Sequence, residues 1–149
     1  MIGLIQRVSS ARVDVANACV GTIEQGLLVL LGVEAQDTAE SAKWLAERIA
    51  NYRVFSDDAG KMNLSARDLD CAILAVPQFT LAADTSRGRR PSFSRAAPPE
   101  LGESLFERFT GDLRALEMTV ETGVFGADMQ VSLVNEGPVT FWLQTPGTQ

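Results

Sequence analysis

Residues Ala75–Phe93 read AVPQFTLAADTSRGRRPSF, and the rest of the chain is organised around this stretch. Its first half is apolar with Gln78 and Thr80 set into it, which predicts a strand that brings polar groups to one edge of a sheet. Its second half turns at Asp84-Thr85-Ser86 and becomes basic, with arginines at Arg87, Arg89, Arg90 and Arg95. From Thr85 to Pro99 there is no Asp or Glu.

The basic half of this stretch contrasts with the rest of the chain. The 149 residues include 13 Lys and Arg against 19 Asp and Glu, a net charge of −6. A single cationic patch on an acidic protein favours a local anionic ligand over general adhesion to nucleic acid. The alternative is an ordinary solvated loop, because most charge runs simply face water.

A second stretch lies near the C-terminal end, where Val134–Thr140 reads VNEGPVT. Asn135-Glu136-Gly137-Pro138 is a turn signature between the apolar segments MQVSLV and VTFWLQ. Pro138 has a fixed φ and no N–H, while Gly137 can adopt backbone conformations closed to other residues. Taken alone, this stretch predicts a hairpin.

Composition limits the classes of protein to consider. With 46% hydrophobic and 21% charged residues, the chain is expected to form one globular domain. Its longest apolar run, GLLVLLGV, is far shorter than the about 20 residues of a membrane helix and predicts a buried strand. We expect no signal peptide. Cys19 and Cys71 lack CxxC spacing and are interpreted as small buried residues rather than a disulfide or metal site, which fits a reducing cytoplasm.

The chain contains no histidine. This excludes Ser–His–Asp and Cys–His nucleophile pairs, His-ligated zinc and an imidazole general base. Chemistry would then fall to carboxylates, hydroxyls, Lys43, Lys61, backbone groups or the substrate itself. We therefore expect no metal and no cofactor, and an ordinary esterase or peptidase is disfavoured.

Hydrophobic periodicity predicts two helices among the strands. The first runs from about Thr38 to Tyr52, with Asp37 or Thr38 as its cap and a buried stripe at Ala42, Leu45, Ala46 and Ile49. The second starts at Pro98-Pro99 and ends near Glu117, with a stripe at Leu101, Leu105, Phe109, Leu113 and Leu116. Strands are expected at Ile2–Val8, Arg12–Ala16, Cys19–Ile23, Gly26–Val33, Ala72–Val76, Thr119–Thr122, Met129–Val134 and Val139–Gln144. Grouped strands with two separate helices predict an α+β fold.

Several separated motifs occur in an order that resembles the D-aminoacyl-tRNA deacylases. They are the opening MIGLIQRVSSARV, then GLLVLLGVE, YRVFSDDAGKMNL, QFTLAADT, GRRPSF and NEGPVTFWLQ. The resemblance extends from Met1 to about Gln144, so residues 1–145 are interpreted as one deacylase domain and residues 146–149 as a frayed C-terminal tail. It implies a single α+β domain with mostly antiparallel strands in a barrel-like sheet, two main helices and a homodimeric assembly.

The resemblance also assigns roles to individual residues. It implies that Gly137-Pro138 has a cis bond and reaches into the partner's pocket, where its backbone excludes L-amino acids and admits D-amino acids and glycine. The matching arginine, Arg7, would hold this Gly-Pro backbone. Gln78, Phe79 and Thr80 match the QFT element, and Gln78 and Thr80 are interpreted as positioning residues, not nucleophiles. Phe125 and Met129 are candidates to pack against the terminal adenine, with core packing as the alternative.

One position departs from the usual family pattern, because Pro77 stands where the family commonly has Ser. A related branch that edits L-alanine also has proline there, but it has Ala after the Gln. Phe79 and Arg7 match the D-specific branch, so Pro77 is interpreted as a tolerated variant.

The activity that the resemblance implies is hydrolysis of the ester between a D-amino acid, or a misplaced glycine, and the 3′-terminal adenosine of tRNA. Backbone N–H groups would polarise the ester carbonyl, and the neighbouring ribose 2′-OH would activate the water. The arginines Arg87, Arg89, Arg90 and Arg95 are candidates to contact acceptor-stem phosphates. Two alternatives stay open: a non-catalytic RNA-binding module, and a dimeric structural domain whose Gly-Pro segment only forms the interface.

Overall fold

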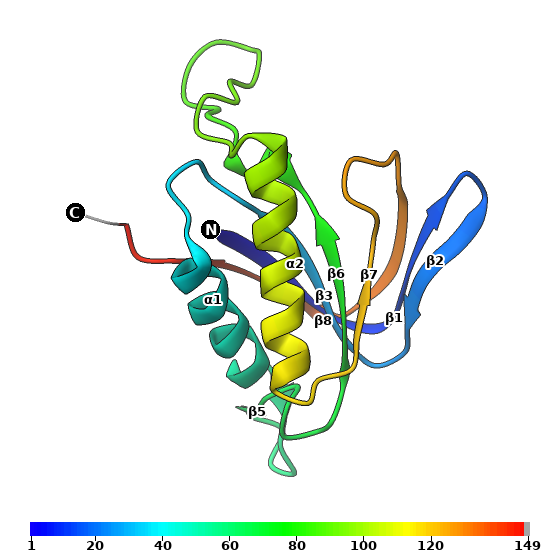
Figure 1. Ribbon diagram of the computed structural model, residues 1–149. Helices are drawn as coiled ribbons and strands as arrows, with labels where there is room; N and C mark the ends of the chain where they lie inside the picture. The colour runs from blue at the N-terminus through cyan, green and yellow to red at the C-terminus, as the bar shows by residue number, and fades with distance from the viewer. Residues whose placement is uncertain (148–149) are drawn as a thin grey trace.

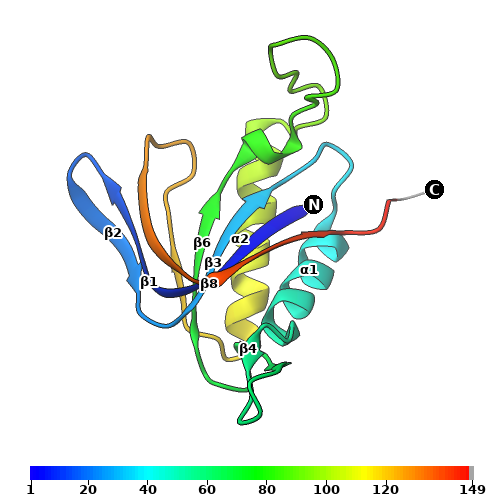
Figure 2. The same cartoon turned by 180° about the vertical axis from the view of Figure 1, so that it is seen from behind.

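The chain forms one curved mixed sheet with two helices on one of its faces, as the computed structural model shows for residues 1–147 (Figures 1 and 2). The helices are α1 (Ala39–Asn51) and α2 (Pro99–Ala115), and η1 (Phe79–Ala82) is a short 3-10 helix. The strands are β1 (Ile2–Val15), β2 (Ala18–Ile23), β3 (Gly26–Gly32), β4 (Phe55–Ser56), β5 (Met62–Leu64), β6 (Ala72–Pro77), β7 (Val120–Thr122) and β8 (Gln130–Gln144).

The long strand β1 organises the sheet. Strand order is β2-β1-β3-β6-β7, with β8 also paired to β1, and β4 and β5 form a separate small sheet. The pairs that include β1 are antiparallel, whereas β3–β6 and β6–β7 are parallel. Parallel strands need a crossover, and α1 and α2 lie in these two crossovers. The predicted α+β domain with a barrel-like sheet and two main helices is confirmed; the homodimer stays a prediction.

Both helices pack on the sheet as their periodicity predicts. Thr38 caps α1, because its side chain accepts a hydrogen bond from the Ser41 N–H and Ser41 bonds back to the Thr38 N–H. All four residues of the stripe predicted for the first helix are buried. In α2, Leu105, Phe109 and Leu113 are buried, and Leu101 and Leu116 are partly buried against the same core.

A second, smaller core fills the inside of the curved sheet. It contains Val8, Ala11, Val13, Ile23, Leu28, Leu74 and Val76. Alternate residues of β3 and β6 therefore face the helices and this inner core, so both strands are buried on both faces. The predicted hairpin of the second and third strands is confirmed as β1–β2, although β1 also includes the predicted strand Ile2–Val8 without a break.

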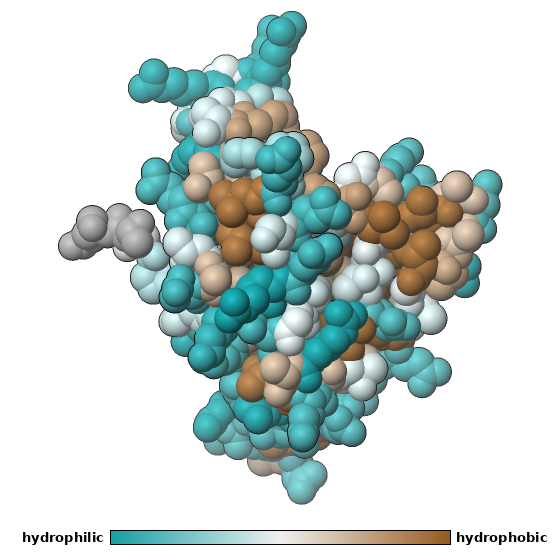
Figure 3. All heavy atoms as spheres, in the orientation of Figure 1, coloured by the Kyte–Doolittle hydropathy of each residue, from teal (hydrophilic) through white to brown (hydrophobic). Residues whose placement is uncertain are grey.

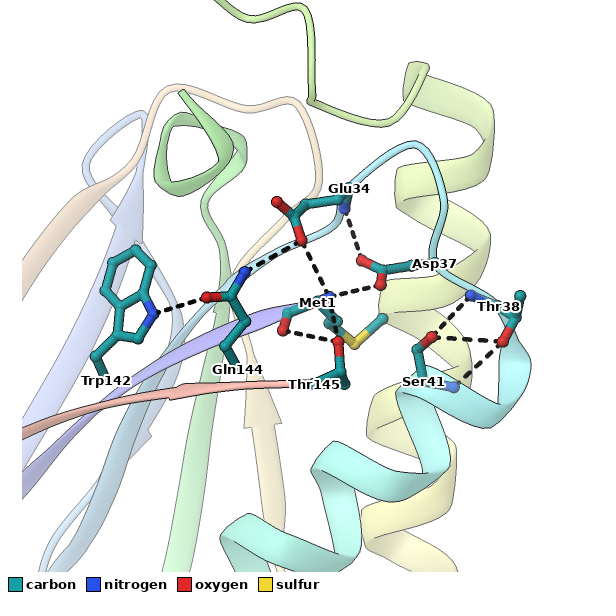
Figure 4. Close-up of polar contacts among 8 residues, drawn as sticks. All are labelled: Met1, Glu34, Asp37, Thr38, Ser41, Trp142, Gln144 and Thr145. Atoms are coloured by element: carbon teal, nitrogen blue, oxygen red, sulfur yellow. Dashed lines mark hydrogen bonds and ion pairs between the residues drawn. The ribbon is translucent and has the colours of Figure 1, made fainter. Parts of the chain in front are cut away.

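The ammonium group of Met1 joins three segments at one end of the sheet (Figure 4). It donates to the carboxylate of Asp37 and lies 3.4 Å from a carboxylate oxygen of Glu34 and 2.7 Å from the Thr145 hydroxyl. The Gln144 amide also donates to Glu34, at 3.5 Å. The start of β1, the β3–α1 loop and the end of β8 are thereby fixed to one another, with the buried positive charge balanced by carboxylates.

The structure corrects two expectations. Gln130–Gln144 is one strand, because the segments before and after Gly137-Pro138 pair with the same strand β1 in the same antiparallel sense. Gln6 pairs with Thr140 and Val8 with Asn135, so the extra residues of β8 form a bulge and not a hairpin turn.

The second correction concerns the QFT element, which was expected to continue a strand. β6 ends at Pro77 because its partner β3 ends there: the last pair in the ladder is Leu31 with Pro77. The backbone groups of the next residues instead form hydrogen bonds with one another. The Leu81 N–H donates to the Gln78 carbonyl, and the Ala83 N–H donates to the Thr80 carbonyl. Within the predicted tail, residues 146–147 have no regular structure, and residues 148–149 lie outside the described residues.

Candidate active site

A pocket of about 460 Å³ opens between the end of β6, η1, the start of α2 and the loop after β7. Its walls are mostly apolar, and four of the predicted site residues line it: Gln78, Phe79, Phe125 and Met129. Pro77 also lines it. A concave, largely apolar cavity with a few polar groups at its mouth is the usual form of a small-ligand site.

Close packing at the end of β3 places η1 at the mouth of this pocket. A Cβ atom added at Gly32 would lie 2.9 Å from Cβ of Leu81 and 3.3 Å from the Gln78 carbonyl oxygen. The Gln78 N–H donates to the Leu31 carbonyl at 2.8 Å. Glycine at position 32 therefore lets the QFT element sit directly against the strand.

Gln78 and Thr80 form a polar pair at the pocket mouth. The Gln78 side-chain amide donates to the Thr80 hydroxyl oxygen, which leaves the hydroxyl hydrogen free to donate to a ligand. Thr80 itself is exposed and does not line the pocket. In residues 1–147, no lysine, aspartate or glutamate side chain is hydrogen-bonded to Thr80, so its hydroxyl has no base to activate it.

The loop after β7 forms the wall opposite Gln78. The Gly123 N–H donates to the Ala75 carbonyl at 2.9 Å, and the Val124 N–H donates to the Met129 sulfur at 3.4 Å. Phe125 is partly buried against the core and lines the pocket beside α2. Met129 and Phe125 thus contribute both to core packing and to the pocket surface, and their contact with the terminal adenine stays a prediction.

Arg7 and Gly137-Pro138 lie together at a different place. Arg7 and Gly137 border a smaller hollow of about 220 Å³, whose other lining residues are Gln25, Phe55, Ser56, Leu69 and Glu136. Arg7 Nε donates to the Glu136 carbonyl at 3.1 Å and Nη1 to the Val54 carbonyl at 2.7 Å. The Gly137–Pro138 peptide bond is cis, and both residues are exposed. Neither residue lines the pocket of its own chain.

Asn135 closes the bulge that presents this pair. Its side-chain oxygen accepts from the Val139 N–H at 2.9 Å, and its amide donates to the Val139 carbonyl at 3.0 Å. The Asn135 side chain therefore makes the hydrogen bonds to the Val139 backbone that a neighbouring strand would otherwise make. Sequence reasoning named Asn135 only as a turn residue, and no sequence signal pointed to the contact between Arg7 and Val54.

The four predicted arginines are all exposed on one loop, residues 84–96, which extends beyond the start of α2 (Figure 1). Asp84 and Ser92 close its base by exchanging backbone hydrogen bonds of 2.7 and 3.0 Å. Hydrogen bonds from the Ser86 hydroxyl and N–H, with Arg95 nearby, hold the pKa of Asp84 below its ordinary value. Phe93, which sequence reasoning passed over, contacts Phe79 across this base.

Two solved structures share this fold. One, described as "c-Myc DNA Unwinding Element Binding Protein", matches with a TM-score of 0.93 and 38% identity, covering 99% of this chain and 100% of that chain. The other, described as "Structural Analysis of a probable eukaryotic D-amino acid tRNA deacylase", matches with a TM-score of 0.85 and 17% identity, covering 97% and 98%. The second likeness concerns the fold alone.

The sequence relatives are more specific. A D-aminoacyl-tRNA deacylase of Pseudomonas fluorescens (strain SBW25) is 61% identical over 145 residues, covering 97% of this chain and 100% of the relative. One of Geobacter sulfurreducens is 57% identical over 145 residues, covering 97% and 95%. Residues 4–144 match the family described as D-Tyr-tRNA(Tyr) deacylase. The chain belongs to this family and is therefore a deacylase, an ester hydrolase.

Two further properties concern the part of the chain that the structure describes. None of its helices combines the length and the apolar character needed to cross a bilayer. Its Cys, Asp and Glu side chains form no group of three or more that could hold a metal ion.

Proposed function

We propose that this protein hydrolyses the ester bond of D-aminoacyl-tRNA and of mischarged glycyl-tRNA, and that it rejects L-aminoacyl-tRNA. The products are the free amino acid and the free tRNA, which makes the reaction a step of translation quality control in the cytoplasm. The observation that carries the proposal is a division of the site into two parts, an apolar pocket beside Gln78 and an outward-facing Gly137-Pro138 held by Arg7.

In the proposed arrangement, the two parts of the site come from two copies of the chain. Gly137 and Pro138 are exposed and lie outside the pocket of their own chain, so they are available to a partner. Large apolar side chains are also exposed on the sheet, among them Val20, Val134 and Trp142, and Figure 3 shows hydrophobic residues gathered where β2 and the start of β8 lie. We propose a homodimer in which each Gly137-Pro138 enters the partner's pocket.

A wall made of backbone suits discrimination by handedness. The Gly137-Pro138 segment is fixed by Arg7 and Asn135, so it would not retreat from a side chain pointing the wrong way. Rejection by a rigid wall excludes the L side chain without selecting among D side chains. Broad acceptance of D-amino acids and of glycine follows.

In the proposed mechanism the protein positions the ester and the substrate supplies the group that activates water. Gln78 and Thr80 hold the ester at the pocket mouth, with the Thr80 hydroxyl as a donor. Backbone N–H groups polarise the carbonyl, and the ribose 2′-OH beside the ester assists the attacking water. Phe125 and Met129 would enclose the terminal adenosine and the amino acid, and Phe79 lines the same pocket beside them as a further substrate-binding residue.

A substrate ending in 2′-deoxyadenosine tests the role of the ribose. We expect its D-amino acid ester to be hydrolysed about 100-fold more slowly than the ribose ester, the usual contribution of a positioned proton-transfer group. Single-turnover rates with saturating protein separate this effect from binding. Equal rates for the two esters would contradict substrate assistance.

Thr80→Ala tests whether Thr80 is a positioning residue. Losing one hydrogen bond to the reacting group should lower kcat/KM about 10- to 100-fold. Removing a true nucleophile would cost about a millionfold in kcat. Thr80→Ser keeps the hydroxyl and should retain most of the activity, and a complete loss in Thr80→Ala with D-aminoacyl-tRNA binding intact would make Thr80 the nucleophile instead.

The exposed arginines of loop 84–96 would contact phosphates of the acceptor stem. No acidic residue follows Asp84 until Glu100, so the loop carries uncompensated positive charge on a protein of net charge −6. Such contacts make tRNA binding weaken as salt rises.

Deacylation of matched D-tyrosyl- and L-tyrosyl-tRNA tests the function directly. We expect kcat/KM for the D ester to exceed that for the L ester by at least about 100-fold, and EDTA to leave the rate unchanged. Hydrolysis of both esters would mean that the wall fails, for example because of Pro77. Hydrolysis of neither, with aminoacyl-tRNA still bound, would favour the RNA-binding module, and failure to bind any aminoacyl-tRNA would favour the structural dimer.

A further inference from the structure

Two phenylalanine rings stand exposed between the pocket and loop 84–96. Phe79 begins η1 and lines the pocket, and 58% of its surface is accessible to solvent. Phe93 lies near the end of the loop and is 42% accessible. Their ring centroids are 5.2 Å apart with an angle of 52° between the ring planes. We refer to Phe79 and Phe93 as the aromatic pair.

The backbone on both sides of Phe93 is fixed, so the pair is a built feature of the surface. Ser92, directly before it, exchanges two backbone hydrogen bonds with Asp84. After it, the Ala96 N–H donates to the Phe93 carbonyl at 3.1 Å, and the Ala97 N–H donates to the Val33 carbonyl at 3.0 Å. The returning segment of the loop is thus pinned to the chain that follows β3.

The surroundings of the aromatic pair indicate what it binds. On one side lies the pocket, and on the other lies a loop with four exposed arginines and no acidic residue after Asp84. Aromatic faces beside a cationic surface are the arrangement that binds single-stranded nucleic acid, because bases stack on the rings while phosphates meet the arginines. A pair of exposed phenylalanines contributes little to folding, since half of their surface stays in water.

We infer that the aromatic pair is a stacking platform for the unpaired bases that precede the terminal adenosine of the substrate tRNA. The inference rests on the proposed function, in which the pocket takes the terminal adenosine and its amino acid. With the acceptor-stem phosphates on loop 84–96, the single-stranded 3′ segment has to pass over Phe79 and Phe93. Phe93 then acts in binding the substrate and takes no part in the hydrolysis itself.

The test compares uncharged tRNA with the same tRNA in which the two nucleotides before the terminal adenosine lack their bases, titrated into the protein. The native protein should bind the intact tRNA at least about tenfold more tightly, the contribution of one stacked base. Phe93→Leu should lose most of this preference, and Phe93→Tyr, which keeps a ring, should restore it. Arg89→Ala should weaken the binding of both tRNAs alike. It should also reduce the slope of the logarithm of the binding constant against the logarithm of the salt concentration by about one.

Trp44→Leu is the matched control, because Trp44 is an exposed aromatic residue on α1, away from the pocket and the loop. It should bind both tRNAs as the native protein does. Melting temperatures of all variants confirm that they are folded, and sedimentation reports whether Phe93→Leu changes the association of the protein with itself.

Three outcomes would overturn the inference: equal binding of the two tRNAs by the native protein, an undiminished preference in Phe93→Leu with unchanged self-association, or an undiminished preference in Phe93→Leu together with altered self-association. The last would assign the pair to a contact between copies. A protein that hydrolyses D-tyrosyl-tRNA but shows one of these outcomes disproves the platform alone. A protein that hydrolyses neither tyrosyl ester disproves the proposed function, while the binding comparison with uncharged tRNA still reports on the platform.

Discussion

Alanine at position 26 is expected to destabilise the protein more than any other single methyl group that could be added to the sheet. A Cβ atom at Gly26 would lie 1.9 Å from the Ala72 carbonyl oxygen and 2.9 Å from its carbon, both backbone atoms of the paired strand β6. β3 cannot move away, because Gly26 also pairs with Val8 of β1. We expect Gly26→Ala to cost about 4 kcal/mol of unfolding free energy. The melting temperature should fall by about 10 °C.

The matched control for this change is Gly111→Ala. Gly111 lies in α2, and apart from the backbone of its own helix and its chain neighbours no atom lies within 4 Å of an added Cβ, so alanine there should raise stability by up to about 1 kcal/mol through helix propensity. Thermal unfolding followed by circular dichroism measures both variants. A melting temperature of Gly26→Ala within about 3 °C of the native value would mean that β3 and β6 separate easily, and the packing argument would be wrong.

Arg7→Ala is expected to lower kcat/KM for D-tyrosyl-tRNA about 100-fold and to narrow the difference between the D and L esters. Its guanidinium joins the Glu136 carbonyl to the Val54 carbonyl, and each hydrogen bond from a charged donor is worth about 1.5–3 kcal/mol. Without it, the segment that carries Gly137 and Pro138 is no longer tied to the chain after α1. Arg7→Lys should restore little of the lost activity, since one ammonium group lacks the planar fork of donors that reaches both carbonyls.

Arg12→Ala is the control for Arg7, because it removes an arginine from the same strand. Arg12 donates hydrogen bonds of 2.7–3.0 Å to the carboxylate of Asp14 on the surface, and its side chain makes no hydrogen bond to the bulge. Its activity toward both esters should stay within about twofold of native, as for most exposed ion pairs. An equal loss of activity in Arg7→Ala and Arg12→Ala would mean that net charge, and not the hydrogen bonds between Arg7 and the bulge, determines the activity.

Local signals in the sequence were sufficient where the structure depends on local contacts. Thr38 and the apolar spacing after it predict α1 within a residue at each end, because a cap and a buried stripe are formed by neighbours in the chain. Proline near the start of α2 marks its beginning in the same way. The motif comparison also named four of the residues that line the pocket, since Gln78, Phe79, Phe125 and Met129 come together there.

Features that depend on distant partners were not predictable in this way. Asn135–Pro138 has the composition of a turn, and whether such a segment reverses the chain or forms a bulge is decided by β1, more than 120 positions earlier in the sequence. The QFT element has strand-like residues but turns into η1 because β3 ends. The contact between Phe79 and Phe93 likewise joins two ends of a loop, which no periodicity reveals.

The bulge in β8 also bears on how the protein avoids uncontrolled association. In residues 1–147, β8 pairs only with β1, so its other edge offers free N–H and C=O groups to any extended chain. A straight edge of 15 residues would be a template for fibril growth. The bulge divides it into two short segments, and Pro138 supplies no N–H between them. The same residues that we propose to exclude L-amino acids thus also interrupt the free edge of β8 and make aggregation through it less favourable.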